Sequence, residues 1–321
     1  MELSAKRVLG NTWCIATPMA WIPYYQINET DIILLDSGYM LHGELEAWIK
    51  EHNFKVRAIL NTHEHWDHVV ANGNLQREYG AKIYMPKAEA ALVETPIGKN
   101  VLHEPGNFME IQNFYSMFSF RVDEVISAED GMIEVCGIPF EVIHTPGHSL
   151  DHVSFITPDR VLYVGDVLMS ADELRRAKIS CAVSHEVDIE SKKKLKRYSC
   201  EAYILAHGSI EQDITALIDE NIAYVHQRGE DLLQMIHQPM SMEEIIRTVW
   251  KQFGLRSGSY YKNLEVGNMI RSLVKYMVSE KKLENRYYDG VDYYARSGNG
   301  EQPAWQENEE TPHISPWYPV Q

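Results

Sequence analysis

The spacing of hydrophobic residues divides the first two thirds of the chain into alternating strands and helices. Short apolar runs bounded by turn-forming residues are typical of buried strands, and apolar residues three and four positions apart are typical of amphipathic helices. We therefore expect a meander of strands over residues 12–36, a helix over 41–52 and a strand over Val56–Leu60. A second series of strands falls between residues 132 and 164, and a further strand covers Ala202–Leu205. This alternation predicts an α/β layer arrangement.

After residue 207 the pattern changes to helices followed by a β-hairpin. One helix opens with a capping box at Ser241–Glu244, and the hairpin turns at Asp289-Gly290, a strong hairpin signal. The expected ranges are 213–228, 242–253 and 262–279 for the helices, and 283–288 and 291–296 for the strands. We predict a first domain over residues 1–224, a small α+β domain over 225–298 and an irregular, acidic, proline-containing tail over 299–321.

The composition is that of an ordinary soluble globular protein with an acidic balance. Of the 321 residues, 45% are hydrophobic and 24% are charged, and the formal net charge is -16. The excess of acidic residues argues against a broad nucleic-acid-binding surface, because Lys and Arg carry the affinity for phosphates. We expect a cytoplasmic protein with reduced thiols. No apolar run is long enough to span a membrane, the start lacks the apolar core of a secretory signal, and the four cysteines lie far apart.

The densest group of potential metal ligands lies on a loop between an expected strand and a helical pattern over residues 69–79. Its sequence is Asn61-Thr62-His63-Glu64-His65-Trp66-Asp67-His68. Alternate side chains of an extended segment point the same way, so His63 and His65 are expected to face one metal ion together. Asp67 and His68 are displaced enough to serve a second ion. Imidazole nitrogen and carboxylate oxygen are good ligands for zinc and similar ions.

Three more candidate ligands follow at turns or strand ends. They are His148 in Thr145-Pro146-Gly147-His148-Ser149, Asp166 in Tyr163-Val164-Gly165-Asp166, and His207 in Ala206-His207-Gly208. Together with the loop, they resemble the metallo-β-lactamase superfamily, whose signature is His-x-His-x-Asp-His with these further residues in this order. The resemblance implies a four-layer αβ/βα sandwich over residues 1–224 that holds metal ions at one edge between its two sheets.

The resemblance also implies a role for each of these residues. It assigns one ion to His63, His65 and His148, a second ion to Asp67, His68 and His207, and places Asp166 as the bridge between them. Two ions about 4 Å apart can hold a hydroxide that attacks a carbonyl or phosphoryl centre. The implied cofactors are two divalent ions, zinc first, with manganese or iron as alternatives. Asp166 and Asp67, the latter as a proton relay, are the expected catalytic residues.

Asp36 ends the expected meander. In the superfamily an aspartate at this position lies beneath the metal site and orients the ligand loop, and a plain Asx turn is the alternative interpretation.

The metal motifs are similar to those of glyoxalase II and its thioesterase relatives, whereas the C-terminal segment resembles a winged helix. We therefore expect a dinuclear hydrolase for a small ester, thioester or lactone, with the C-terminal domain packed on the body, at the pocket rim or in a dimer. A phosphodiesterase acting on single-stranded RNA and a single-iron persulfide dioxygenase are the alternatives. The expected partner is a small-molecule substrate. Nucleic acid is not favoured, no membrane is expected, and a homo-oligomer stays open.

Two other stretches carry chemistry that the motifs do not use. Residues 95–127 hold an aromatic cluster that suits either a pocket wall or a helix packed on the core. The basic run Lys192–Arg197 is interpreted as a solvated helix face rather than an anion site. Arg175 and Arg176 are candidates for contact with a substrate carboxylate or phosphate.

Overall fold

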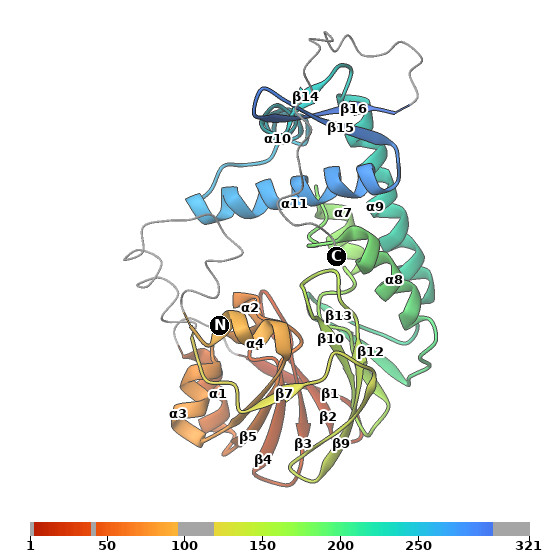
Figure 1. Ribbon diagram of the computed structural model, residues 1–321. Helices are drawn as coiled ribbons and strands as arrows, with labels where there is room; N and C mark the ends of the chain where they lie inside the picture. Colours follow the sequence, from red (N-terminus) through yellow and green to blue (C-terminus); the bar gives the residue numbers. More distant parts are fainter. Residues whose placement is uncertain (1–2, 40–42, 96–118, 298–321) are drawn as a thin grey trace, which may run out of the picture.

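A seven-stranded sheet forms the first half of the molecule, and its strands follow in sequence order (Figure 1). The computed structural model describes residues 3–39, 43–95 and 119–297. The strands are β1 (Ser4–Leu9), β2 (Thr12–Ala16), β3 (Ile22–Gln26), β4 (Asp31–Leu35), β5 (Lys55–Leu60), β6 (Lys82–Pro86) and β7 (Glu124–Ile126). From β1 to β4 the strands are antiparallel, which confirms the predicted meander, and from β4 to β7 they are parallel.

The second sheet has six strands in the order β13-β12-β11-β10-β9-β8. They are β8 (Gly131–Val135), β9 (Ile138–His144), β10 (Val153–Ile156), β11 (Val161–Tyr163), β12 (Ala202–Leu205) and β13 (Ser209–Glu211). Only β11 and β12 run parallel to each other, and the remaining neighbours are antiparallel. Carboxyl ends of parallel strands meet at the same edge of a sheet, so the residues after β11 and β12 come close together.

Helices cover the outer face of each sheet. They are α1 (Glu44–Glu51), α2 (Trp66–Val69), α3 (Asn72–Tyr79), α4 (Lys87–Val93), α7 (Ala171–Arg176), α8 (His185–Leu195) and α9 (Thr215–Met235). The helix predicted over residues 69–79 is confirmed by α3, which begins three residues later and ends at the predicted residue, and the short helix α2 before it was not predicted. The carbonyl oxygen of His68 accepts a hydrogen bond from Ser37 N at 2.8 Å, which ties the end of α2 to the neighbouring loop.

Alternation along the strands produces the layers. On β4, Ile32 and Leu34 pack in the cluster beneath α1 and α3, whereas Ile33 and Leu35 pack in the cluster between the two sheets. On β11, Tyr163 joins the cluster between the sheets, and Leu162 joins the cluster that contains residues of α8 and α9. The result is helix, sheet, sheet and helix, as the four-layer expectation requires.

The C-terminal part contains α10 (Met242–Gln252), α11 (Tyr260–Ser279) and a three-stranded sheet of β14 (Met240–Ser241), β16 (Val291–Arg296) and β15 (Leu283–Tyr288). Both local predictions are confirmed: Ser241 and Glu244 form a capping box, and Asp289 and Gly290 have φ values of 47° and 79°. These elements share one apolar cluster with the second half of α9. Figure 1 shows α11 lying across the top of the sandwich.

Several predictions are only partly covered by the described residues. Most of the aromatic stretch over 95–127 and all of the tail over 299–321 lie outside them. The boundary between residues 224 and 225 falls inside α9, which ends about two turns later than predicted, and the division into domains stays a prediction. The four cysteines are free thiols, and no described helix is long and apolar enough to cross a membrane.

Candidate metal centre

The seven predicted ligands come from the ends of four strands and meet at one edge of the sandwich. The loop with His63 and His65 follows β5, His148 follows β9, Asp166 follows β11 and His207 follows β12. The ligand atoms form two groups, in each of which all lie within 4.8 Å of one another. The first group contains His63, His65, His148 and Asp166, and the second contains Asp67, His68, Asp166 and His207.

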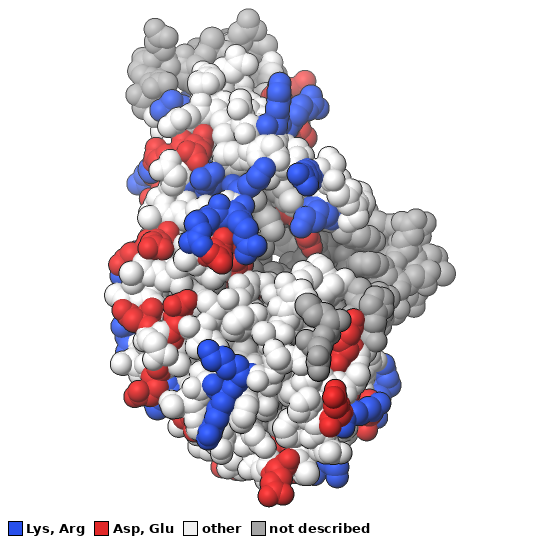
Figure 2. Space-filling view, turned by 180° about the vertical axis from the view of Figure 1, so that it is seen from behind, with Lys and Arg blue, Asp and Glu red and all other residues white. Residues whose placement is uncertain are grey.

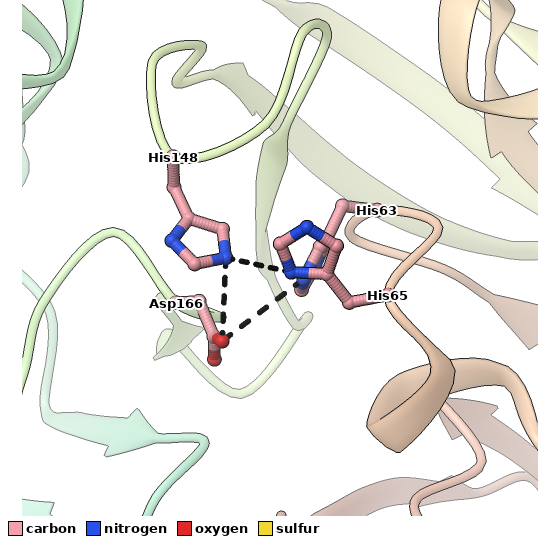
Figure 3. Close-up of side chains that lie close together, drawn as sticks. All are labelled: His63, His65, His148 and Asp166. Atoms are coloured by element: carbon pink, nitrogen blue, oxygen red, sulfur yellow. Dashed lines mark hydrogen bonds and ion pairs between the residues drawn. The ribbon is translucent and has the colours of Figure 1, made fainter. Parts of the chain in front are cut away.

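The first group is built around His148. Its Nε2 atom lies 3.0 Å from His65 Nδ1 and 3.4 Å from Asp166 Oδ2. His63 approaches from the same loop as His65, and its Nε2 atom is 4.0 Å from Asp166 Oδ2. Figure 3 shows the three rings and the carboxylate pointing toward one another. The alternation of an extended segment therefore brings His63 and His65 to one site, as the sequence predicted.

The second group is built around the carboxylate of Asp166. His68 Nε2 lies 3.2 Å from Asp166 Oδ1, and His207 Nε2 lies 3.2 Å from Asp166 Oδ2. Asp67 completes the group, with Oδ2 at 3.6 Å from His207 Nε2. Because Asp166 belongs to both groups, one carboxylate connects them.

The donor set passes a physical test for cation binding. His63 Nε2, His68 Nε2 and Asp166 Oδ1 are buried and have no hydrogen-bond partner among the described residues, although His68 Nε2 and Asp166 Oδ1 lie 3.2 Å apart as an ion pair. Buried polar atoms without partners are rare and costly, and here they converge on one place. Imidazole nitrogens and carboxylate oxygens at this density fit divalent transition metals. Two His/Asp clusters joined by one carboxylate are consistent with a dinuclear site.

The pKa values of the histidines in both ligand groups also favour a bound cation. Burial holds the pKa of His63 well below its usual range and lowers the pKa of His148 to about 3, so both rings offer a lone pair. Burial acts in the same direction on His68, but the nearby carboxylates raise its pKa well above the ordinary value, and Asp166 raises the pKa of His207 to about 9. The carboxylate of Asp166 thus favours positive charge at this position.

Asp36 orients the metal-binding loop, as the resemblance implied. Its Oδ1 accepts a hydrogen bond from Thr62 N at 2.8 Å. Its Oδ2 accepts from Thr62 Oγ1 at 2.9 Å, from His68 Nδ1 at 2.8 Å and from Tyr163 Oη at 2.7 Å. Since Nδ1 of His68 donates to Asp36, Nε2 is left to face Asp166. A plain Asx turn would not reach His68.

His152 performs a similar task for the bridging residue. Its Nε2 atom accepts a hydrogen bond from the backbone N of Asp166 at 3.2 Å, and its Nδ1 atom lies 2.9 Å from Thr145 Oγ1. The side chain is fully buried. It therefore connects the loop that follows β9 with the turn that follows β11.

Glu89 on α4 was not among the predicted site residues. This buried carboxylate accepts hydrogen bonds from Ser149 Oγ at 2.7 Å, from Asp151 N at 2.8 Å and from Glu64 N at 3.2 Å. Burial and the nearby Glu64 raise its pKa to about 7. Glu89 thus ties the loop after β5 to the loop after β9. Glu89 belongs to no sequence motif, and no helix was predicted over α4.

A second missed carboxylate, Glu265, belongs to α11. Burial raises its pKa, and the charges of His65, Asp67 and Glu64 also act on it, so it lies near the site although more than 100 residues separate it from His148. By contrast, Arg175 and Arg176 stay on their own helix. Arg175 pairs with Asp172, and Arg176 Nε donates to the carbonyl oxygen of Asp172 at 3.2 Å.

Comparison with known families agrees with this geometry. The model of the metallo-beta-lactamase superfamily matches residues 23–207, which include all seven ligand positions. The chain belongs to this superfamily. The predicted membership of the superfamily and the predicted cluster of His and Asp residues are thereby confirmed.

Relatives within the superfamily cover parts of the chain. Hydroxyacylglutathione hydrolase GloC of Haemophilus influenzae is 29% identical over 146 residues, which are 44% of this chain and 63% of that protein. Hydroxyacylglutathione hydrolase of Rhizobium meliloti is 29% identical over 123 residues, or 38% of each chain. A probable metallo-hydrolase of Streptococcus pyogenes is 29% identical over 160 residues, 45% of this chain and 60% of that one. The matches thus span less than two thirds of these relatives.

Two solved structures are similar in fold to most of this chain. A metallo-beta-lactamase family protein from Thermus thermophilus has a TM-score of 0.67 and 18% identity, and the match covers 89% of this chain and 99% of the other. A beta-lactamase domain protein from Burkholderia ambifaria has a TM-score of 0.66 and 15% identity, with 92% and 94% covered. At this coverage the shared fold reaches beyond the sandwich into the C-terminal part.

Proposed function

We propose that this chain is a dinuclear metal-dependent hydrolase that acts on a small thioester, ester or lactone. The observation that carries the proposal is the pair of ligand groups joined by Asp166, with three buried ligand atoms that lack other partners among the described residues. The substrate class is supported by the relatives named hydroxyacylglutathione hydrolases, since an acyl group on the glutathione thiol is a thioester. Zinc is the proposed metal because the donor set is rich in imidazole, and manganese or iron would fit the same ligands.

The ligands divide the work between two ions. We assign His63, His65 and His148 to one ion, Asp67, His68 and His207 to the other, and Asp166 to both. When bound, such a pair lowers the pKa of an attacking water and stabilises the negative charge that develops on the substrate oxygen. Asp36, His152 and Glu89 hold the ligand loops in place, so that the site is organised before substrate arrives.

Asp67 is the proposed proton relay. Its side chain is 15% exposed, whereas His68 is fully buried, so Asp67 can contact both the ligand group and the solvent side of the site. A carboxylate in this position can take a proton from the attacking water and pass it toward the leaving group. The residues deeper in the site lack this access.

The C-terminal part supplies the upper wall of the proposed substrate pocket. Figure 1 shows the first half of α11 directly above α2, and Glu265 of α11 lies near His65 and Asp67. Figure 2 shows the surface hollowed between the sandwich and the C-terminal part, with lysine and arginine side chains gathered above the hollow. A substrate seated there would contact both parts of the chain.

The C-terminal part itself is proposed to be a winged-helix-like domain. The order of elements supports this: a short strand β14, then α10 and α11, then the hairpin β15–β16, with β16 between the other two strands. We place its start near residue 225, at the level where α9 leaves the sandwich. We propose that it packs on the catalytic body and shapes the pocket rim, and a homo-oligomer stays an open prediction.

A second candidate is a phosphodiesterase acting on single-stranded RNA. One observation favours it: a groove on the C-terminal part is lined by Arg247, Lys251 and Arg271 together with Trp250. Cations beside an aromatic ring suit a phosphate chain with stacked bases. Glu243 also lines the groove and lies 3.5 Å from Arg271, which reduces the positive charge. We therefore rank this function second.

Elemental analysis followed by a substrate panel tests the proposal. Protein purified without added metal is expected to carry about two zinc, manganese or iron atoms per chain. It should then hydrolyse S-lactoylglutathione or a simple thioester faster than a single-stranded RNA, with free thiol as the readout. A single iron with no second atom taken up on soaking would contradict the dinuclear site and favour persulfide oxidation. Two metals with cleavage of RNA alone would favour the second candidate.

A further inference from the structure

The basic run of α8 contains a buried ion pair that its sequence did not suggest. Lys192 is 5% exposed and Asp188, one turn earlier, is 1% exposed. The ammonium of Lys192 donates a hydrogen bond to Asp188 Oδ2. Asp188 Oδ1 has no hydrogen-bond partner among the described residues. The interpretation of this run as a solvated face is therefore wrong for Lys192, because this residue faces inward.

One side of α8 holds the loop that carries His148. The carbonyl oxygen of Gly147 accepts hydrogen bonds from Val183 N at 2.8 Å and from Ser184 N at 3.1 Å. Ser191 Oγ donates to the carbonyl oxygen of Pro146 at 2.6 Å. A Cβ atom at Gly147 would lie 2.2 Å from the backbone N of Asp188, so the loop and the first turn of α8 are in direct contact.

The other side of α8 packs on the C-terminal part. Ile189 belongs to the apolar cluster formed by α9, α10 and α11. The ring of His185 is 1% exposed and lies with its centroid 5.9 Å from that of Tyr276 on α11. Figure 1 shows α8 beside α9 and beneath α11. The helix is thus held between the His148 loop and the C-terminal part.

We propose that the Asp188–Lys192 pair is a positioning device that fixes α8 against the His148 loop and so supports metal binding by His148. Removing two charges from water is costly, and replacing a buried ion pair by apolar residues of similar volume often leaves the protein equally stable. The contribution that we infer for this buried pair is therefore to the orientation of α8 against the His148 loop rather than to stability. Asp188 and Lys192 are positioning residues, since neither belongs to the ligand groups. The inference rests on the proposed function, because it assumes that His148 binds a metal.

Zinc affinity of the full-length chain tests the inference. Lys192→Met leaves Asp188 buried without its partner, and Lys193→Met is the matched control. Lys193 pairs with Glu190 on the same helix at 2.8 Å, but these side chains are 53% and 68% exposed. In competition with a chromophoric chelator, Lys192→Met should bind zinc about tenfold more weakly or worse, the size of effect seen when residues behind metal ligands are changed. Lys193→Met should match the wild type.

A second variant separates positioning from stability. In the double variant Asp188→Leu/Lys192→Met, an apolar pair should restore the unfolding temperature, while zinc affinity stays as low as in Lys192→Met. Recovery of zinc affinity together with the unfolding temperature would overturn the inference, and so would wild-type affinity in Lys192→Met. A wild-type chain that binds no zinc would overturn the proposed function as well, which distinguishes the two failures.

Discussion

At the residue scale, a few buried carboxylates organise the site. Asp36 follows β4 and reaches Thr62 in the loop after β5, His68 on α2 and Tyr163 on β11. Glu89 connects the loop after β5 with the loop after β9 in the same manner. Each carboxylate accepts several hydrogen bonds at once, so each can hold loops that have no regular structure of their own.

Replacing Asp36 tests this role directly. In Asp36→Asn an amide group faces Thr62 Oγ1, His68 Nδ1 and Tyr163 Oη, all of which donate to Oδ2 in the wild type. We expect zinc affinity to fall about 10- to 100-fold and the free energy of unfolding to fall by about 2–3 kcal/mol. The control is Asp31→Asn at the start of the same strand, whose carboxylate pairs with Arg57 at the surface. Equal zinc affinity in both variants would contradict the role of Asp36.

Asp166 is the residue on which both ligand groups depend. Asp166→Asn keeps the shape of the side chain but removes the negative charge that lies 3.2 Å from both His68 Nε2 and His207 Nε2. We expect one of the two metals to be lost and hydrolysis to be abolished, as judged by metal content and by thioester turnover. Two metals bound with an unchanged rate would exclude the proposed mechanism.

At the scale of elements, the strands position the ligand residues, and tight turns orient their side chains. Gly165 links β11 to Asp166 with a φ of 59°, a left-handed conformation that glycine adopts readily. A Cβ atom there would lie 2.6 Å from His152 Nε2 and 3.1 Å from Thr62 Cβ. The turn is therefore packed between two segments of the site, and only a residue without a side chain fits.

Gly165→Ala should move the bridging carboxylate. The backbone conformation alone costs a non-glycine residue about 1–3 kcal/mol, and the contact with His152 adds to this. We expect a lower unfolding temperature and weaker binding of both metals, measured by thermal melting and elemental analysis. In the control Gly131→Ala, the new Cβ meets nothing within 4 Å, so neither quantity should fall. Wild-type metal content in Gly165→Ala would show that the turn tolerates a side chain.

At the scale of the whole molecule, metal binding and folding are coupled. The ligands come from both sheets, and the buried Nε2 atoms of His63 and His68 have no hydrogen-bond partner among the described residues. A ligand that binds only the folded state, present at about a thousand times its Kd, adds about 4 kcal/mol to the free energy of unfolding. The sandwich is therefore expected to be most stable with metal bound.

Chelation should reveal this coupling. Dialysis against a strong chelator is expected to lower the unfolding temperature by several degrees, and added zinc should restore it. Each kcal/mol corresponds to about 2–4 °C in a chain of this size range. Calorimetry of metal-free and zinc-loaded protein measures the difference. An unfolding temperature that does not depend on metal would mean that the ligand groups are satisfied without a cation.

The sequence by itself determined where many of the elements lie and which residues are candidate ligands. Ranges such as Ala202–Leu205 and the hairpin at Asp289-Gly290 follow from local spacing and turn chemistry, and the structure confirms them. The ligand motifs were also readable, because each lies at a strand end within a short segment. The short helix α2 could not be recognised in this way. The carbonyl oxygen at its His68 accepts a hydrogen bond from Ser37, which lies in another loop.

Only the tertiary structure decided which residues support the ligands. Glu89 and Lys192 carry no motif, and the local pattern makes Lys192 look like a surface residue. Their positions arise because folding brings α4 and α8 against loops that are distant in the chain. Burial and proximity depend on how layers pack, and spacing along one segment cannot encode the partner that another segment will present.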